Sequence, residues 1–455
     1  MKNFSPAYSK RQGLKPPELY EYFVDNFWFR TTDLENGKMN TPLRGSNKAD
    51  VVIIGGGYTG LSAAYNIHKQ FPDKQIMLLE GACCGYGASG RNGGFCSAIA
   101  MLDEGCKEDP EARQKCLEVS GHGIDQIKEV ITEYGLDCDF EENGMLDVAL
   151  DEKQAQALES ECRDLKEWGL TASFIQGQTL QDEVKSSRFI AGLDIAHGAT
   201  LNPAKLARGM KKIVEGLGVE IREQSVVTRI IPGKTHHVDT ELGDVKTPVI
   251  VLATNAYSHK LGFFKNRAFP MCTFVVATEP LTPLQLEGIG WKNRQGLSDL
   301  RMLFNYSILS KDNRIVIGGS DFLYYANDGL SSGNNMMVTN KIINDLHKTF
   351  PSLEGINIEH AWGGSASGSI GHTPSIGVMG DHDNIYYGVG FSEGVPVTQT
   401  AGKIISDLMA GKQNEFTTHY FVNRKIPYAG PRFLRSMFGT MAKWYLVSII
   451  RGGGH

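Results

Sequence analysis

The sequence predicts a mixed α/β (α+β) protein, in which a Rossmann-like βαβ domain is interleaved with a second domain built on a mainly antiparallel sheet. Residues 51–54 form a short β-branched run that breaks into three glycines, and a helical pattern and a second apolar run follow at 61–70 and 76–79. Residues 273–278 and 314–318 alternate with a period of two, which is typical of antiparallel strands. At 455 residues the chain also exceeds what one compact core usually supports.

The first βαβ unit carries a phosphate-binding motif. Gly55-x-Gly57-x-x-Gly60 follows the first strand directly and opens the helix, and this context makes it much stronger than an isolated match. The first glycine permits the turn, the second lets a pyrophosphate touch the backbone, and the third lets the helix pack on the strand. Glu80 ends the next strand, where a carboxylate accepts ribose hydroxyls and repels a 2′-phosphate. The motif therefore predicts a bound dinucleotide without a 2′-phosphate.

A second glycine-rich segment indicates which dinucleotide is bound. Residues 85–94 follow the ribose-binding acid directly, and half of these ten residues are glycines. Such backbone can run along a long cofactor towards its reactive ring, and Ser89 and Arg91 can reach phosphate oxygens. A nicotinamide cofactor needs no such segment here, whereas a flavin must be held along its whole length. The segment predicts FAD; the alternative is a surface loop.

The order of the predicted elements gives a discontinuous domain plan. Residues 111–168 are mainly helical, strands are expected at 226–231 and 249–253, and a strand at 385–387 and a helix at 397–409 return to the first domain. We therefore expect four parts: an N-terminal arm at 1–48, a FAD-binding domain at 49–110, 195–262 and 356–412, a substrate domain at 111–194 and 263–355, and a tail at 413–455.

The C-terminal tail is basic and amphipathic. Residues 423–455 contain no Asp or Glu, and the apolar side chains between Phe433 and Tyr445 recur at helical spacing on one face. One interpretation is a helix that makes peripheral contact with an anionic membrane. The interpretation we favour is packing against the body of the protein or against a sister subunit, in which case the chain forms an oligomer.

Composition narrows the class of protein further. The net charge of −5 provides no basic field, so binding to nucleic acid is not expected. The eight cysteines lack paired C-x-x-C spacing, and the N-terminus lacks the charged flank and apolar core of a signal peptide. These features predict a cytoplasmic enzyme with reduced thiols and no bound metal.

Segments in a specific order carry a family resemblance: 51–60 with Glu80, 87–94, 362–377 and 388–403. Over about residues 49–411 the chain resembles the FAD-dependent D-amino acid oxidase/glycine oxidase (DAO) superfamily. Within it, the sequence is most similar to the γ-glutamylputrescine oxidoreductase-like amine oxidases. The resemblance implies that an amine or amino acid is oxidised at its C–N bond to an imine by hydride transfer to N5 of FAD, followed by hydrolysis. Oxygen or another electron acceptor then reoxidises the flavin.

Departures from the family pattern refine these expectations. Covalent members attach the flavin through a His or a Cys, where this chain has Arg91-Asn92 and Gly364-Ser365, so FAD is expected to be noncovalent. Relatives that handle small amino acids often place a basic residue after the last glycine turn to hold the carboxylate. Here Val395-Pro396-Val397 offers no cation, and the acid Glu393 precedes it, which favours a cationic amine substrate.

The motifs and the resemblance together nominate the site residues. His372 and Glu393 are the candidate catalytic residues, with a turn histidine and a helix cap as the competing structural interpretations. Aromatic candidates for the pocket, which otherwise belong to the core, are Tyr257, Tyr306, Tyr324 and Tyr325. The candidate cofactor-binding residues are Gly55, Gly57, Tyr58, Thr59, Gly60, Glu80, Gly87, Ala88, Ser89, Arg91, Asn92, Gly93, Gly94, Val227, Ala253, Trp362, Gly390, Phe391, Ser392 and Gly394.

Two other functions stay open at this point. A flavin dehydrogenase of similar fold can act on a hydroxy acid or polyol and pass electrons to a quinone at the membrane surface, which the basic tail fits. A flavin-bound subunit of a larger complex can lack independent turnover, and the long insertions and tail suit that role. Release of ammonia or a free amine separates amine oxidation from both.

Overall fold

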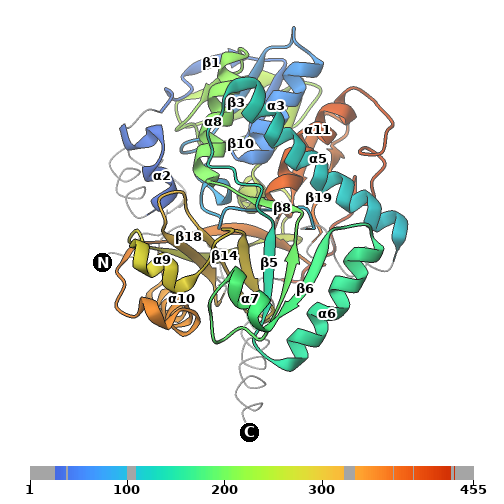
Figure 1. The fold of residues 1–455 in the computed structure, drawn as a ribbon. Helices are drawn as coiled ribbons and strands as arrows, with labels where there is room; N and C mark the ends of the chain where they lie inside the picture. Colours follow the sequence, from blue (N-terminus) through green and yellow to red (C-terminus); the bar gives the residue numbers. More distant parts are fainter. Residues whose placement is uncertain are drawn as a thin grey trace.

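The computed structural model describes residues 26–36, 39–99, 109–321, 334–371, 373–392, 394–431 and 435. Two large sheets form separate layers, and helices cover their outer faces (Figure 1). The six-stranded sheet has the order β19-β20-β13-β2-β3-β9, and the eight-stranded sheet has the order β18-β14-β17-β16-β15-β5-β7-β6. The predicted α/β (α+β) class is therefore confirmed.

The six-stranded sheet contains the predicted βαβ unit. Its central strand β2 pairs in parallel with β3 on one side and β13 on the other, and every residue of β2 and β3 is buried. Such continuous apolar runs suit a sheet that is covered on both faces. Only the edge strand β19 runs antiparallel. The strands are β2 (Val51–Ile54), β3 (Ile76–Leu79), β9 (Glu220–Arg222), β13 (Val249–Leu252), β19 (Ser375–Met379) and β20 (Ile385–Val389).

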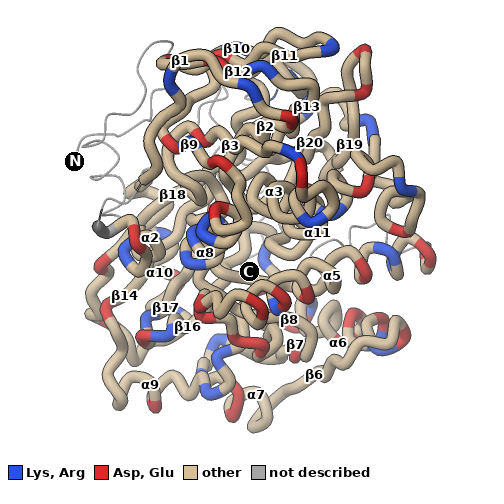
Figure 2. The backbone as a smooth tube through the Cα atoms, turned by 90° about the horizontal axis from the view of Figure 1, so that it is seen from above, with Lys and Arg blue, Asp and Glu red and all other residues tan. Residues whose placement is uncertain are grey.

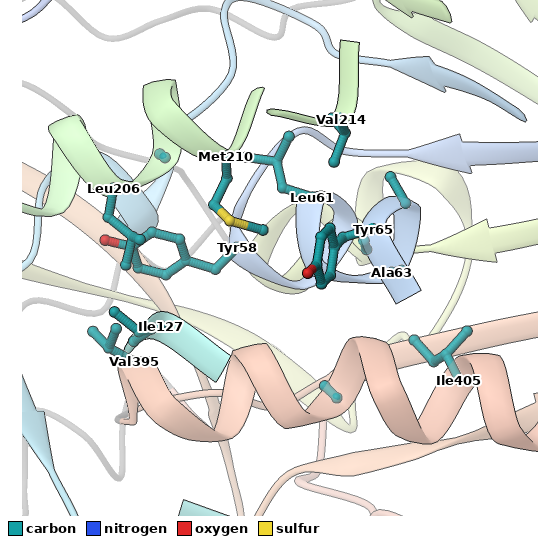
Figure 3. Close-up of a cluster of buried hydrophobic side chains, with 14 of the residues drawn as sticks. Tyr58, Leu61, Ala63, Tyr65, Ile127, Leu206, Met210, Val214, Val395 and Ile405 are labelled. Atoms are coloured by element: carbon teal, nitrogen blue, oxygen red, sulfur yellow. The ribbon is translucent and has the colours of Figure 1, made fainter. Parts of the chain in front are cut away.

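Four helices pack into one core beside this sheet. Side chains from all four point into the same cluster, with Tyr58, Leu61 and Tyr65 at its centre (Figure 3). The last helix lies against the first: the Ser62 hydroxyl bonds to the Gln399 carbonyl at 2.5 Å. C-terminal sequence thus completes the fold around the phosphate motif. The helices are α3 (Tyr58–Gln70), α5 (Pro110–Tyr134), α8 (Pro203–Gly216) and α11 (Val395–Met409).

The eight-stranded sheet is mainly antiparallel, as predicted. Its longest pair, β14 and β18, runs antiparallel, and the single parallel pair joins β15 to β5. Its strands are β5 (Met145–Ala149), β6 (Ala172–Gln176), β7 (Ala191–Ile195), β14 (Ala268–Thr278), β15 (Gly296–Asp299), β16 (Asn305–Leu309), β17 (Ile315–Gly319) and β18 (Ile358–Ser369). Its helices are α6 (Glu152–Glu167), α7 (Gly177–Glu183), α9 (Pro283–Ile289) and α10 (Met336–Thr349).

Two smaller sheets accompany the large ones. The strand expected at 226–231 forms as β10, but it belongs to a four-stranded sheet and not to the parallel one. This sheet contains β1 (Gly45–Lys48), β10 (Val227–Ile231), β11 (His236–Thr240) and β12 (Gly243–Thr247), and β4 (Phe95–Ser97) pairs with β8 (Gly198–Thr200). The domain plan stays a prediction. Strand β18 lies in the segment 356–412, which the plan assigns to the FAD-binding domain, and it pairs with β14 of the eight-stranded sheet.

The described part of the N-terminal arm does more than cover the surface. Helix α2 (Phe27–Arg30) buries Phe27, Trp28 and Phe29, and Trp28 is 2% exposed. The Asn26 amide donates to the Gly90 carbonyl at 3.0 Å, and the Trp28 indole donates to the Asn92 carbonyl at 3.0 Å. The arm therefore supports the second glycine-rich segment from behind.

Charged residues of both signs are interspersed along the described chain, as on α5 and α6 (Figure 2). Within the described residues, no helix is both long and apolar enough to cross a membrane. Apart from Arg435, the tail beyond residue 431 lies outside them, so neither interpretation of its amphipathic pattern is tested.

Substitution Trp28→Ala is expected to destabilise the fold by about 3–5 kcal/mol, because it empties a buried aromatic site. It should also lower the FAD content of the purified protein, because Trp28 holds the Asn92 carbonyl. Chemical denaturation and the ratio of flavin to protein measure both effects. Leu284→Ala on α9, where the side chain is 77% exposed, is the control and should change stability by no more than about 0.5 kcal/mol.

Candidate active site

A cavity of about 1060 Å³ lies between the two large sheets. One side is formed by the turns that follow β2, β3 and β13, and the other by residues of the eight-stranded sheet. Ligand sites in proteins commonly measure ~300–1,000 Å³, so this cavity has room for an elongated dinucleotide and a small substrate.

The phosphate turn joins β2 to α3 as the motif predicts. A Cβ atom on Gly60 would stand 1.9 Å from the Gly55 carbonyl oxygen, so only glycine permits this approach of helix to strand. A Cβ atom on Gly57 would stand 3.0 Å from the Ser89 hydroxyl, which accepts the Tyr58 backbone N–H at 2.9 Å. The two glycine-rich segments therefore meet at the N-terminus of α3, where backbone N–H groups favour an anion.

Glu80 follows β3 and lines the cavity. Its carboxylate accepts the backbone N–H groups of Gly56 at 2.7 Å and Ala82 at 2.8 Å. Burial raises the pKa of Glu80 to about 7, and the negative charge of Glu223 acts in the same direction, against the lowering by the two backbone hydrogen bonds. The carboxylate is thus held beside the phosphate turn, where the sequence places the ribose contact.

Arg91 lies between the two halves of the site. Its guanidinium donates to the carbonyls of Tyr86 at 2.7 Å and Gly363 at 3.3 Å, and it stacks over the Phe29 and Tyr86 rings. The Trp362 indole in turn donates to the Arg91 carbonyl at 2.9 Å. These bonds tie Arg91 to β18, so they give no support to the phosphate contact expected from the sequence. Ser89 is the side chain of this segment that bonds to the phosphate turn.

Most of the predicted cofactor-binding residues line the cavity: Gly55, Gly57, Tyr58, Thr59, Glu80, Gly87, Ala88, Ser89, Arg91, Asn92, Gly93, Val227, Ala253, Phe391, Ser392 and Gly394. Four others do not line it: Gly60, Gly94, Trp362 and Gly390. Tyr257 and Tyr306 also line it. Outside the described residues are His372, Glu393, Tyr324 and Tyr325. Their roles stay predictions.

Asn255 is a site residue that the sequence reasoning missed. It follows β13 with a φ of 36°, and its side-chain oxygen accepts the backbone N–H groups of Gly390 and Phe391, each at 3.2 Å. Its amide donates to the Phe391 carbonyl at 3.1 Å. Asn255 thus joins the turn after β13 to the turn before α11. The signal available was an Asn directly after an apolar strand, a residue type that tolerates positive φ.

The wall formed by the eight-stranded sheet holds a second missed group. Asp147 of β5 lies opposite Ser298 of β15 in the parallel ladder, and the Ser298 hydroxyl donates to its carboxylate. Also in the cavity lining, the Tyr306 ring of β16 packs edge-on against Phe95 at 5.8 Å and lies 6.0 Å from Phe304. The pattern Met-Leu-Asp-Val-Ala, one acid in an otherwise apolar strand, was the available signal.

The residues present fit FAD. The cavity joins an anion-binding helix N-terminus, a buried acid beside it and a glycine-rich backbone that leads to the second sheet, which together match pyrophosphate, ribose and an elongated remainder. Among the residues that the structure describes, no group of three or more His, Cys, Asp or Glu side chains is arranged to hold a metal ion. Fold and cavity thus define a dinucleotide-binding enzyme of the flavoprotein class.

Comparison with known proteins identifies the family. The profile of the DAO family, described as FAD dependent oxidoreductase, matches residues 50–408, and the chain belongs to this family. It is 31% identical to gamma-glutamylputrescine oxidoreductase of Escherichia coli (strain K12) over 89% of this chain and 93% of that protein. It is 30% identical to the probable oxidoreductase OrdL of Haemophilus influenzae over 92% of this chain and 95% of that protein.

Solved structures share the fold. Glycine oxidase from Geobacillus kaustophilus superposes with a TM-score of 0.72 at 18% identity, covering 84% of this chain and all of that one. L-proline dehydrogenase from P. horikoshii superposes with a TM-score of 0.70 at 18% identity, covering 87% of this chain and 99% of that one. The predicted resemblance is confirmed, and the chain is an FAD-dependent oxidoreductase that binds its flavin noncovalently.

Substitution Gly57→Ala is expected to weaken FAD binding by about tenfold or more, the equivalent of losing ~1.4 kcal/mol. The added methyl group would crowd the Ser89 hydroxyl and keep a pyrophosphate off the backbone. Titration of the apoprotein with FAD, followed by flavin fluorescence, measures the change. Gly121→Ala in α5, where a Cβ atom meets nothing within 4 Å, is the matched control. Equal affinities for all three proteins would contradict the role of Gly57.

Proposed function

We propose that this enzyme oxidises the C–N bond of an amine or amino acid to an imine, with FAD taking the hydride at N5 and water then hydrolysing the imine. The observation that carries the proposal is the single cavity in which the cofactor-binding turns open directly onto the wall of the eight-stranded sheet. The name of the Escherichia coli relative, gamma-glutamylputrescine oxidoreductase, and that of the structural neighbour glycine oxidase support an amine or amino-acid substrate.

The protein's part in this reaction is to position and enclose the substrate. Aromatic side chains that line the cavity, such as Phe95, Phe304 and Tyr306, exclude water from the reacting bond. The N-terminus of α11 begins at Val395, and Ser392, Gly394 and Val395 line the cavity. A helix N-terminus at this place would stabilise negative charge on the reduced ring.

We further propose the electron acceptor, the cellular compartment and the roles of the remaining residues. Oxygen or another acceptor reoxidises the flavin. The enzyme works in the cytoplasm, because its eight cysteines lack paired C-x-x-C spacing and suit a reducing compartment. The domain plan and the roles of the cofactor-binding residues form part of the same proposal. His372 and Glu393 remain its candidate catalytic residues, with the tail as a candidate contact for a membrane or a sister subunit.

The direct test is anaerobic mixing of the holoenzyme with a panel of amines and of D- and L-amino acids, while the visible flavin absorbance is followed. Rapid bleaching by one compound, with release of ammonia or a free amine, is the expected result. If every amine leaves the flavin oxidised while hydroxy acids or polyols bleach it, the hydroxy-substrate alternative replaces the proposal.

The value of kcat/KM should rise with pH from neutrality, by about tenfold per pH unit, until the amine itself loses its proton near ~10. An ammonium group has no lone pair, so only the neutral amine can release a hydride from its α-carbon. Initial rates in buffers of constant ionic strength from neutral to alkaline pH measure the profile. A flat profile over this range would contradict amine oxidation.

A further inference from the structure

Asp147 has no evident structural partner for its charge. Its carboxylate lines the cavity, its side chain is partly accessible there, and its hydrogen bond comes from the neutral Ser298 hydroxyl. Among the described residues, no cationic side chain pairs with it. A carboxylate withdrawn from water without a cation destabilises a protein, so its presence in this wall calls for a ligand that compensates.

The surroundings make this wall electronegative. Asp147 is the one formally charged residue that the eight-stranded sheet contributes to the cavity; the others there are Met145, Ile195, Thr273, Ser298, Tyr306, Gly364, Ser365 and Ala366. Burial raises the pKa of Asp147 to about 6, the negative charges of Glu161 on α6 and Asp299 on β15 act in the same direction, and the Ser298 hydrogen bond lowers it. The group is therefore mainly ionised at neutral pH and free to attract a cation.

We propose that Asp147 binds a second ammonium group of the substrate, distant from the C–N bond that is oxidised. The substrate class is then a diamine, a polyamine or a conjugate that keeps a second cationic group. This inference rests on the proposed amine oxidation and specifies its substrate. The Ser298 hydroxyl fixes the carboxylate, and the Phe304 and Tyr306 side chains line the same cavity and offer aromatic contacts for an alkylammonium chain.

The same wall disfavours a simple amino acid. An α-amino acid would need a cation for its carboxylate, and the eight-stranded sheet supplies none to the cavity within the described residues. A carboxylate placed against Asp147 would be repelled. The charge of this wall therefore favours an amine with a second cationic group over a simple amino acid, although Arg91 and Lys260 line other parts of the cavity.

The test compares putrescine with n-butylamine, which has the same four-carbon chain and lacks the second ammonium. Asp147→Asn keeps the shape and the bond from Ser298 and removes the charge. The control is Asp194→Asn on the neighbouring strand β7, a partly buried carboxylate that does not line the cavity. For Asp147→Asn, kcat/KM for flavin reduction by putrescine should fall about 10- to 100-fold, with less than about a threefold change for n-butylamine.

The outcomes separate the two proposals. If both amines reduce the flavin and Asp147→Asn affects them equally, the inference about Asp147 is overturned and amine oxidation stands. If neither reduces it, amine oxidation by this substrate class fails. Binding of putrescine, read from the shift of the flavin spectrum, then decides the role of Asp147: loss of binding in Asp147→Asn supports it, and equal or absent binding overturns it.

The thermal stability of Asp147→Asn shows whether Asp147 acts in substrate binding or in folding. The pKa of Asp147 is raised in the folded state, so its contribution to stability is fullest at acid pH, declines as pH rises from about 4 to about 6, and is constant above that. Asp147→Asn should therefore keep or raise the Tm at neutral pH. A lower Tm, with equal losses for both amines, would show a structural role and overturn the inference.

Discussion

The close approach of two glycine-rich segments at the N-terminus of α3 is the constraint on which the cofactor site depends. The contact of Gly60 with the Gly55 carbonyl brings the helix onto the strand, and the Ser89 hydroxyl then joins the second segment to the first. A Cβ atom added at Gly60 would collide with the Gly55 carbonyl, and one added at Gly57 would crowd the Ser89 hydroxyl. The turn lines the cavity, and the N-terminal end of the helix dipole favours the anion that such a turn binds.

Hydrogen bonds from buried tryptophan and arginine side chains hold the second glycine-rich segment against the eight-stranded sheet. Trp28 and Trp362 donate to the carbonyls of Asn92 and Arg91, and the Arg91 guanidinium reaches the Gly363 carbonyl on β18. The segment that follows the phosphate turn is therefore fixed between the arm and the eight-stranded sheet. Asn255 makes the corresponding link on the opposite side of the cavity, between β13 and the turn before α11.

Sequence predicted best what is local. The strand, glycine turn, helix and strand from 51 to 79, together with Glu80, follow from patterns within about thirty residues. It failed where position depends on distant register: β10 forms but joins another sheet, and the arm buries Trp28. The pair of Asp147 and Ser298 spans 151 positions, so no local pattern could reveal it.

The site holds two partly buried carboxylates that lower the stability of the protein when no ligand is bound. Burial raises the pKa of Glu80 to about 7 and that of Asp147 to about 6, so both oppose folding once they ionise. Glu80 accepts hydrogen bonds from two backbone N–H groups, whereas Asp147 accepts one hydrogen bond, from the Ser298 hydroxyl. A core selected for stability alone would replace such a group with an apolar one. The presence of both carboxylates in one cavity is best explained by ligands that compensate their charge: ribose hydroxyls donate to Glu80, and a cationic substrate pairs with Asp147.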